Sequence, residues 1–366
     1  MSKSVRKADS RSSRRKGKDV KTLVYGAGPL GSLYAARLYQ AGVDVSVLAR
    51  GQRLADLREH GVILEGSHSG QMESHRVPVV EHLGEDDPYD LILVVMRKDM
   101  ALDILPILAN NRHARTILFL QNNPSGFDDY IEALGAQRVM VGFPASGGWR
   151  KDPVMCVMPL DWLYMPIGEV DGHVIPRTQE VASLLRRMGK KVQVRRDIDA
   201  WLVTHVPAIV VFLGVYAADL DAERFGRTRD AMLMGVRARA ESFRAQEAAG
   251  IPISPRLFKL LPMVPEPIAV AIVRSMAGTR FFEVGVLGHA HVARDEMVQI
   301  LEQYRERIAS GGVPAPTLDL LIEHVTGARP LLPDGSRKMP MSWKGVWISV
   351  LAVLSFVGLL LCGRRR

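Results

Sequence analysis

Three glycines follow a short apolar run near the start of the chain. They stand in the pattern G-x-G-x-x-G, in the stretch Gly26-Ala27-Gly28-Pro29-Leu30-Gly31. The first glycine permits a tight turn, the second lets a pyrophosphate approach the backbone, and the third lets a helix pack closely against a strand. Unpaired amides and the dipole at the start of that helix favour a negative charge. The pattern therefore predicts that these six residues bind the diphosphate of a dinucleotide.

The residues around the glycines supply the context that such a site requires. Thr22–Tyr25 is a β-rich run, and apolar residues then recur at helical spacing as far as Ala41. Gly42 predicts the end of the helix, and Asp44–Ala49 is a second apolar run. Strand, glycine turn, helix and strand within thirty residues make a chance match to the glycine pattern much less probable.

The end of the second predicted strand indicates which dinucleotide binds. An NAD site usually presents a carboxylate there to the ribose hydroxyls, but this chain reads Leu-Ala-Arg50-Gly-Gln-Arg53. Arginine forks match the geometry of a phosphate, so Arg50 and Arg53 favour NADP and its 2′-phosphate. The alternative is that both arginines are solvated surface residues.

Strand and helix patterns continue to alternate as far as residue 196, which predicts a doubly wound parallel sheet in an α/β domain over residues 22–196. Ligands of such sheets bind at the carboxyl ends of the strands. Arg97 and Asn122 both stand just past buried apolar runs, at residues 91–95 and 116–121. They are therefore candidate binding residues beside the glycine turn.

The pattern of predicted secondary structure changes near Asp197. Residues 197–328 carry mainly helical periodicity, which predicts a mostly α-helical second domain, and residues 329–342 resemble a linker rich in Pro, Gly and charge. Met1–Lys21 is basic, poor in apolar residues and without the apolar core of a secretory signal, so we expect a disordered arm.

A long apolar stretch lies near the C-terminal end of the sequence. Gly345–Cys362 contains eighteen residues without a charge, flanked by Trp343 and Trp347 on one side and by a basic tail at residues 364–366 on the other. This arrangement predicts a single-pass membrane anchor over residues 343–363, in contact with membrane lipid. The alternative is a hydrophobic helix buried in a homo-oligomer, and the sequence leaves the oligomeric state open.

The net charge of +9 is concentrated at the two ends of the chain. Residues 1–21 carry +7 and residues 336–366 carry +6, so the part between them is mildly acidic. A basic nucleic-acid-binding face is therefore not expected, whereas basic ends suit anionic lipid headgroups. The two cysteines lie far apart and no cluster of metal ligands stands out, which favours a reducing compartment and no metal site. We expect the catalytic part in the cytoplasm.

Several motifs together resemble the ketopantoate reductase family, from about Thr22 to about Val325. They are the glycine turn with its later Leu-Ala-Arg50, the run Leu-Gln-Asn122-Asn123, and Arg274-Ser275-Met276 followed by Phe282-Glu283-Val284. The resemblance implies an NADP-binding Rossmann domain, a helical domain and an active site between them. It also implies that Asn122 contacts cofactor and substrate, that Ser275 binds substrate and that Glu283 lies in the active site. The implied reaction is NADPH-dependent reduction of a small 2-oxo acid.

The chain departs from the family's pattern in three places. Arg97, with Lys98 next to it, stands where the family has a lysine after the strand, and Asn123 stands where the family has the glycine of Q-N-G. The segment from Asp199 to Pro207 resembles the family's W-x-K-x-x-x-N helix, in which the lysine donates the proton, but Val203 stands at the lysine position. A hydride arriving at a ketone leaves an alkoxide, which needs a positioned acid at neutral pH. His205 is the nearest titratable group, although it lies about 200° around a helix from Val203. It is a candidate acid beside Glu283; the alternative is a structural histidine.

Two functions follow from these features. One is a membrane-anchored NADPH-dependent reductase of a small 2-oxo acid. The other is a membrane-tethered NADP-binding protein with weak or no catalysis, acting as a sensor or a partner-binding module. The paired Ser275 and Glu283 favour the first function, and Val203 favours the second. An enzyme for a bulkier or lipid-linked substrate is a third possibility.

Overall fold

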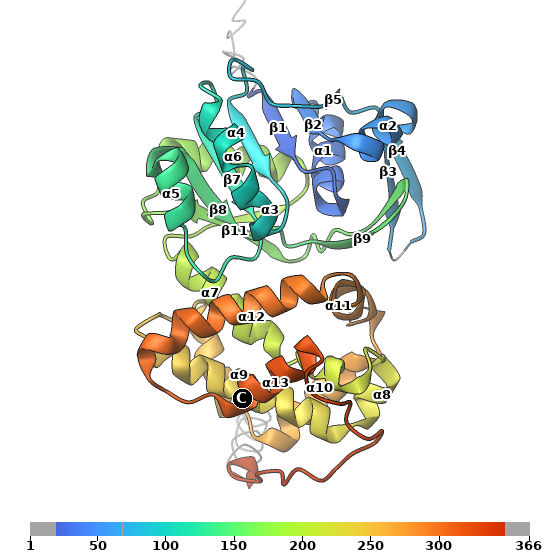
Figure 1. Ribbon diagram of the computed structural model, residues 1–366, viewed down its shortest axis with the longest axis vertical. Helices are drawn as coiled ribbons and strands as arrows, with labels where there is room; N and C mark the ends of the chain where they lie inside the picture. Colours follow the sequence, from blue (N-terminus) through green and yellow to red (C-terminus); the bar gives the residue numbers. More distant parts are fainter. Residues whose placement is uncertain (1–19, 68, 281, 348–366) are drawn as a thin grey trace, which may run out of the picture.

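The computed structural model describes residues 20–67, 69–280 and 282–347. Figure 1 shows an α/β body stacked end to end on a helical body. The chain passes from one to the other between β12, which ends at Val194, and α7, which starts at Ile198. The predicted α/β fold with a parallel sheet, followed by a helical region, is confirmed.

The main sheet has eight strands in the order β12-β11-β8-β7-β6-β1-β2-β5. All neighbouring strands are parallel except β11, which runs antiparallel to β8. The central strands are buried throughout, because helices cover both faces of the sheet. The strands are β1 (Thr22–Tyr25), β2 (Val45–Leu48), β5 (Val79–Val80), β6 (Leu91–Val94), β7 (Thr116–Leu120), β8 (Val139–Gly142), β11 (Tyr164–Glu169) and β12 (Lys191–Val194).

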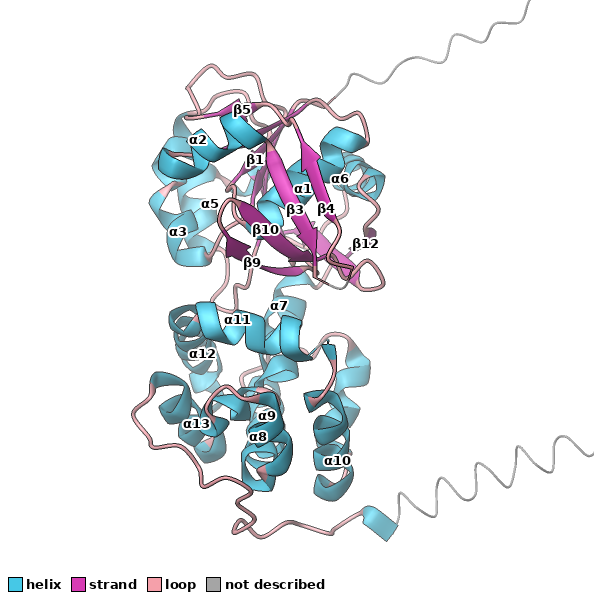
Figure 2. Cartoon of the chain, turned by 90° about the vertical axis from the view of Figure 1, so that its right-hand side faces the viewer, coloured by secondary structure: helices cyan, strands magenta, loops and turns pink. Residues whose placement is uncertain are grey.

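A second sheet, which the sequence patterns do not reveal, lies beside the first. Its order is β4-β3-β10-β9, and Figure 2 shows it in front of α1. Residues distant in the sequence form it, since β3 pairs in parallel with β10. The strands are β3 (Val62–Gly66), β4 (Met72–His75), β9 (Gly147–Lys151) and β10 (Val154–Met158). β9 passes the start of α1: a Cβ built on Gly148 would lie 3.0 Å from the Cβ of Pro29.

Between β6 and β7 the chain forms two short helices that meet at Ile104, and Pro106 stands in the first turn of the second. The helices are α1 (Pro29–Gln40), α2 (Gly51–His60), α3 (Lys98–Asp103), α4 (Leu105–Asn110), α5 (Asp128–Leu134) and α6 (Pro176–Arg187).

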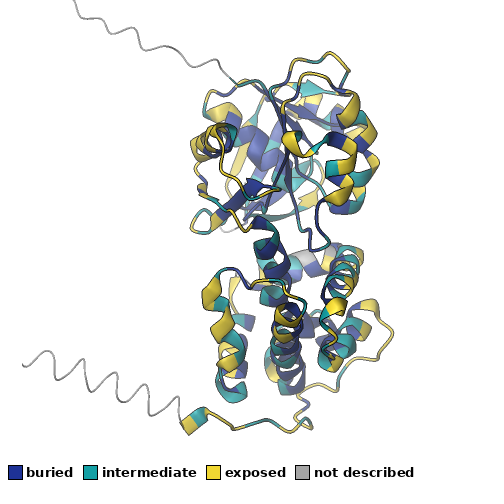
Figure 3. Ribbon diagram, turned by 90° about the vertical axis from the view of Figure 1, so that its left-hand side faces the viewer, coloured by how far each residue is buried: buried dark blue, intermediate teal, exposed yellow. Residues whose placement is uncertain are grey.

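The helical body packs around α7 and α9, and Figure 3 shows a buried centre with outer helices that expose one face. Its helices are α7 (Ile198–Val210), α8 (Ala222–Arg227), α9 (Arg229–Ala248), α10 (Glu266–Ala277), α11 (Gly288–Val292), α12 (Arg294–Ile308) and α13 (Pro316–Thr326). Three 3₁₀ segments, η2 (Leu213–Ala218), η3 (Arg256–Met263) and η5 (Ala309–Gly311), and a π-helical turn, η4 (Phe282–Leu287), lie between them in the described residues.

The segment predicted as a linker packs against the helical body. The buried carboxylate of Asp230 accepts hydrogen bonds from the hydroxyl of Ser336, at 2.6 Å, and from the backbone amides of Lys338 and Met339, at 2.7 and 3.1 Å. Arg224 also donates to the carbonyl of Leu332, at 2.9 Å. Pro and Gly therefore shape a fixed loop here and do not make a free spacer.

Three of the sequence-based predictions fall largely outside the described residues: the basic arm, most of the membrane anchor and the basic tail. Within the described part, one helical stretch, Ile198–Ala218, is long and apolar enough to cross a membrane. Its most apolar window is 67% buried inside the helical body, as expected of a core helix. The C-terminal anchor stays a prediction.

Candidate active site

The glycine turn has the geometry that its spacing predicts. Gly26 has φ +119°, and a Cβ there would lie 2.5 Å from the carbonyl oxygen of Val95 on the neighbouring strand. A Cβ on Gly31 would lie 1.8 Å from the carbonyl oxygen of Gly26, so only glycine allows α1 to start so close to β1. A Cβ on Gly28 would meet no heavy atom within 4 Å. The open side of Gly28 therefore gives a diphosphate room to approach the start of α1.

The backbone at the start of α1 can receive that diphosphate. Gly28 caps the helix without a side-chain hydrogen bond, and Pro29 has no amide hydrogen. Helix geometry gives the amides of Leu30 and Gly31 no intrahelical partner, whereas Ser32 already donates to the carbonyl of Gly28, at 2.8 Å. The sheet order reverses between β6 and β1, the place where doubly wound folds bind nucleotides.

Arg53 does not face a 2′-phosphate, which corrects the prediction that pairs it with Arg50. Its guanidinium is buried and donates to the carbonyl of Ala27, at 3.1 Å, to the carbonyl of Pro153, at 2.9 Å, and to the hydroxyl of Ser32, at 3.1 Å. Burial lowers its pKa. Arg53 therefore connects the glycine turn, through Ala27 and Ser32, to the second sheet, through Pro153.

Arg50 remains available for a phosphate. It is the exposed N-cap residue of α2, directly after β2, with no side-chain capping bond. Its charge reaches the hydroxyl of Tyr25 at the end of β1, where it opposes the rise in the pKa of Tyr25 caused by burial. Arg50 thus stands beside the end of the strand that leads into the glycine turn.

Arg97 joins the two bodies of the protein. It caps α3 after β6, and its guanidinium binds the carboxylates of Asp99, at 2.9 Å, and of Asp295 on α12, at 2.7 Å. The hydrogen bond that Arg97 donates to Asp295 raises the pKa of Arg97. A cofactor or substrate that uses Arg97 must compete with these two carboxylates.

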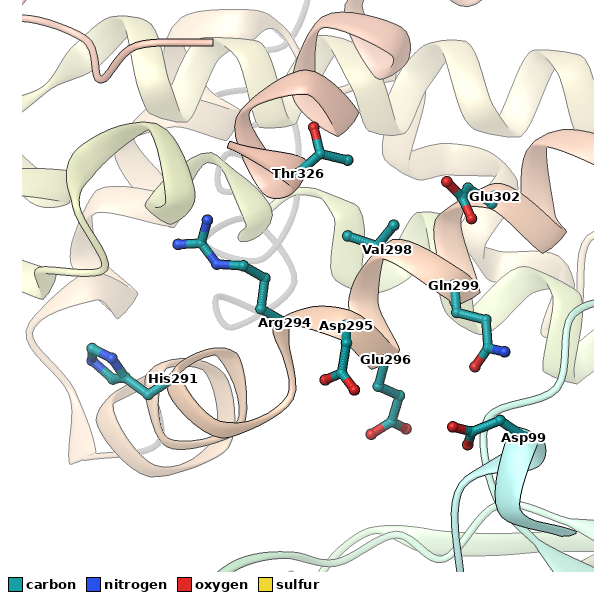
Figure 4. A pocket seen from close by; sticks show the side chains of 9 residues that line it. All are labelled: Asp99, His291, Arg294, Asp295, Glu296, Val298, Gln299, Glu302 and Thr326. Atoms are coloured by element: carbon teal, nitrogen blue, oxygen red, sulfur yellow. The ribbon is translucent and has the colours of Figure 1, made fainter. Parts of the chain in front are cut away.

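An open hollow of about 790 Å³ lies beside this ion pair (Figure 4). Its lining includes four carboxylates, those of Asp99, Asp295, Glu296 and Glu302, against one arginine, Arg294. It includes no residue of the glycine turn. An acidic lining disfavours anions, so this hollow is a poor site for a nucleotide phosphate or an oxo acid.

A buried amine that the motif analysis did not single out lies behind Asn122. Asn122 is half-buried after β7 and next to Asn123, whose side-chain oxygen accepts a hydrogen bond from Lys98, at 3.2 Å. Lys98 also binds the hydroxyl of Ser125 and lies 3.6 Å from the carboxylate of Asp129. Burial lowers the pKa of Lys98. Its only signal in the sequence is its place next to Arg97, just past a buried strand.

His205 lies where the two bodies meet, between aromatic rings. Its ring centroid is 4.2 Å from that of Phe143, just past β8, and 5.5 Å from that of Trp201. Burial lowers its pKa to about 4. The ring is therefore neutral near pH 7 and holds no imidazolium proton to release, which argues against His205 as the acid. Val203 is fully buried in the core of the helical body.

Glu283 and Ser275 lie in different settings. Glu283, on η4, is half-exposed and pairs with Arg280 at 3.1 Å. Arg280 in turn donates to the carbonyl of Ser67, at 2.9 Å, beside the second sheet. The next helix touches β9 as well, since a Cβ on Gly288 would lie 3.8 Å from the Trp149 ring. Glu283 therefore lies against the sheet that flanks the glycine turn.

Ser275 is exposed on α10, and its hydroxyl donates to the carbonyl of Ile272, at 2.7 Å, within the same helix. That bond satisfies the hydroxyl locally, as serines near helix ends commonly do. Ser275 thus has a local role in this conformation, and its substrate contact stays a prediction. The described residues contain no group of three or more His, Cys, Asp or Glu side chains placed to hold a metal ion.

Known proteins share both the glycine turn and the arrangement of strands. Residues 22–158 match the family model described as ketopantoate reductase PanE/ApbA. A 2-dehydropantoate 2-reductase from Archaeoglobus fulgidus is 28% identical over 176 residues, which are 48% of this chain and 56% of that protein. Residues 22–158 of the chain are thus similar in sequence to the ketopantoate reductase family. The match spans little more than half the length of this relative.

Solved structures extend the likeness of fold to the helical body. A PanE/ApbA family ketopantoate reductase from Ralstonia eutropha superposes with a TM-score of 0.66 at 17% identity, covering 83% of this chain and 97% of that one. A D-mandelate dehydrogenase bound to NADH and anilino(oxo)acetate gives a TM-score of 0.66 at 16% identity, covering 84% and 97%. At these identities the comparisons show a shared fold.

Alanine substitutions at Gly28 and at Gly31 should affect NADPH binding and stability separately. Gly28→Ala should change the free energy of unfolding by less than roughly 0.5 kcal/mol, because its Cβ meets nothing, yet weaken NADPH binding by roughly tenfold or more. Gly31→Ala should cost about 1–3 kcal/mol or more, because its Cβ collides with the backbone. Chemical denaturation and a fluorescence titration with NADPH would measure both effects. Equal stability of the two variants would contradict the geometry.

His205 should make stability depend on pH in a defined window. Its pKa is about 4 in the folded protein and about 6.5 when unfolded, so the unfolded state binds its proton first as the pH falls. This histidine's contribution is therefore fully present above pH ~6.5 and is lost as the pH falls toward ~4. His205→Phe, which keeps an aromatic ring, should lose less stability over that window. Parallel curves for the two proteins in urea would show that the histidine is not desolvated.

Proposed function

We propose that the protein reduces a small 2-oxo acid to a 2-hydroxy acid with NADPH. The observation that carries this proposal is the open approach to Gly28, at the point where the sheet order reverses. The ends of β7, β6, β1 and β2 are consecutive there and bring Asn122, Arg97, the glycine turn and Arg50 to one edge. The match of residues 22–158 to the ketopantoate reductase family model supports the proposal.

Each group at this edge could bind a particular part of the cofactor or the substrate. The amides of Leu30 and Gly31 would bind the diphosphate, and Arg50 would bind the 2′-phosphate. Asn122, with amide donors and an acceptor, would orient the carbonyl or carboxylate of the substrate. NADPH would supply the hydride when bound. Lys98 holds Asn123 in place and so positions the neighbouring Asn122.

The proton for the new alkoxide needs a source other than Val203. Glu283 accepts a hydrogen bond from Arg280 as a carboxylate, so in this proposal it positions a water molecule that gives its proton to the alkoxide and does not itself supply the proton. Glu283 stands on the helical body against the second sheet, so closure of the two bodies would bring it toward a substrate held at the strand ends. In this proposal Glu283 is the catalytic carboxyl group.

A second function is an NADP-binding protein without turnover, attached to a membrane by the C-terminal segment. The burial of Val203 in an apolar core favours it, because no amine stands at that place on α7. Both functions require the nucleotide site, and only the first requires Glu283. The membrane attachment itself is part of the proposal in either case.

Turnover distinguishes the two functions. The purified full chain should oxidise NADPH in the presence of at least one member of a panel of 2-oxo acids. Glu283→Gln should lower kcat by roughly a hundredfold and leave NADPH binding unchanged. Glu223→Gln, which removes an ion-paired carboxylate on α8 that is more exposed than Glu283, is the control and should keep full activity. NADPH binding with no turnover on any acid would favour the second function.

Arg50 should set the preference for NADPH over NADH. Arg50→Ala should weaken NADPH binding by about 1.5–3 kcal/mol, roughly ten- to a hundredfold, and leave NADH binding unchanged, because only NADPH carries the 2′-phosphate. Arg58→Ala, on the last turn of the same helix, is the matched control. Titration of each variant with both nucleotides would test this, and equal losses for NADH and NADPH would refute the assignment.

A further inference from the structure

One corner of the helical body carries large apolar side chains that face solvent. On η3, Leu257 is 70% exposed, Leu260 53% and Met263 74%. On the last described residues, Trp343 is 64% exposed and Trp347 78%. We call these five side chains the η3 surface. Apolar side chains so exposed and so close in the fold commonly mark an interaction site.

Contacts between the two segments make this a single surface. η3 ends at Met263, and α10 begins three residues later. The backbone amide of Ser342 donates to the carboxylate of Glu266, in the first turn of α10, at 2.7 Å. A Cβ on Gly345 would lie 3.5 Å from the ring of Pro265. Figure 2 shows the last described turn beside the lower end of α10, away from the α/β body.

The chain reaches this corner along a fixed path. Arg229 donates to the carbonyl of Met339, at 2.7 Å, and Arg237 donates to the carbonyl of Pro340. Together with the bonds to Asp230, these contacts hold the residues that lead to Trp343 against α9. The point at which the chain leaves the described body is therefore set by the fold.

The charge around the η3 surface is mainly basic. η3 itself carries Arg256 and Lys259 and no acidic residue; Lys259 is paired with Glu247 of α9 at 2.7 Å, and the nearby Glu266 is paired with Arg237 at 2.7 Å. Residues 336–366 add six basic residues and no acidic one. Apolar side chains among basic ones suit the interface of an anionic bilayer. Two copies of such a surface would meet with like charges.

We propose that the η3 surface lies on an anionic lipid bilayer, so that the folded body as well as the C-terminal segment contacts the membrane. Gly345–Cys362 follows from the same corner with eighteen uncharged residues, and residues 364–366 are arginines. Trp343 and Trp347 stand at the level where tryptophans prefer to lie, between headgroups and acyl chains. This inference does not depend on the proposed catalysis, but it rests on the proposed membrane attachment of the C-terminal segment.

The contact would fix the orientation of the protein on the membrane. The Met263 end of the η3 surface and the last described residues lie away from the α/β body (Figure 2), whereas η3 starts two residues after Ser254, which binds Asp197 at the junction of the two bodies. A protein held only by a flexible tether would have no such orientation.

Site-specific fluorescence in the full chain tests the proposal. Bimane would be attached at Leu260→Cys, and separately at Leu257→Cys, with Cys362→Ser; Cys156 is buried. Met72→Cys and Met100→Cys, at exposed methionines of the α/β body, are the matched controls. The proteins would be placed on vesicles of phosphatidylcholine and phosphatidylglycerol that contain doxyl-labelled lipid. Quenching at 260 and 257 should exceed that at 72 and 100 by roughly threefold or more.

Two outcomes would overturn the proposal. Sedimentation with the vesicles combined with equally weak quenching at all four positions would mean that the C-terminal segment alone binds lipid. Shielding of the labels at 260 and 257 that grows with protein concentration in the absence of vesicles would mean that a second copy covers the surface. Melting curves of the labelled proteins should match that of the unlabelled chain, since all four positions are exposed.

Discussion

The close approach of α1 to β1 is the constraint on which the site depends. The carbonyl of Gly26 lies where any side chain on residue 31 would stand, so the helix begins directly at the strand end. This contact aims the first amides of α1 at the edge where β6 and β7 also end. Arg53 holds the same turn from behind through Ala27 and Ser32. The turn is thus rigid before any ligand arrives, which lowers the entropic cost of binding.

Ion pairs and arginine–carbonyl bonds carry much of the polar contact between the two bodies. Arg97 binds Asp295, Arg280 donates to the carbonyl of Ser67, and Arg307 on α12 donates to the carbonyl of Ser125. Several of these groups remain partly exposed, so each bond contributes modestly and can break when the bodies move. Such a junction suits a site whose substrate must enter between the bodies.

The parts of the fold that the sequence predicts are those set by neighbouring residues. The strand, turn and helix at 22–40 follow from local spacing, and the change to helices follows from periodicity. The second sheet does not, because β3 and β10 meet across about ninety residues and neither strand alternates strongly. The role of Arg53 could not be predicted from the sequence either, because its partners include Pro153, in the distant turn between β9 and β10. The loop at 331–342 is held by Asp230, a residue on another element.

The acid is the least predictable part of the site for a physical reason. A lysine at position 203 would have to remain charged inside a core of Val206, Val210 and their neighbours, unless a substrate or carboxylate met it there. Valine removes that requirement and stabilises the core of α7 through burial. The buried cation of this region stands instead on the sheet side, at Lys98, where Asn123, Ser125 and Asp129 satisfy it. Charge at the strand ends is thus supplied by the α/β body, and any carboxylate that the helical body contributes must come from its surface, where Glu283 lies.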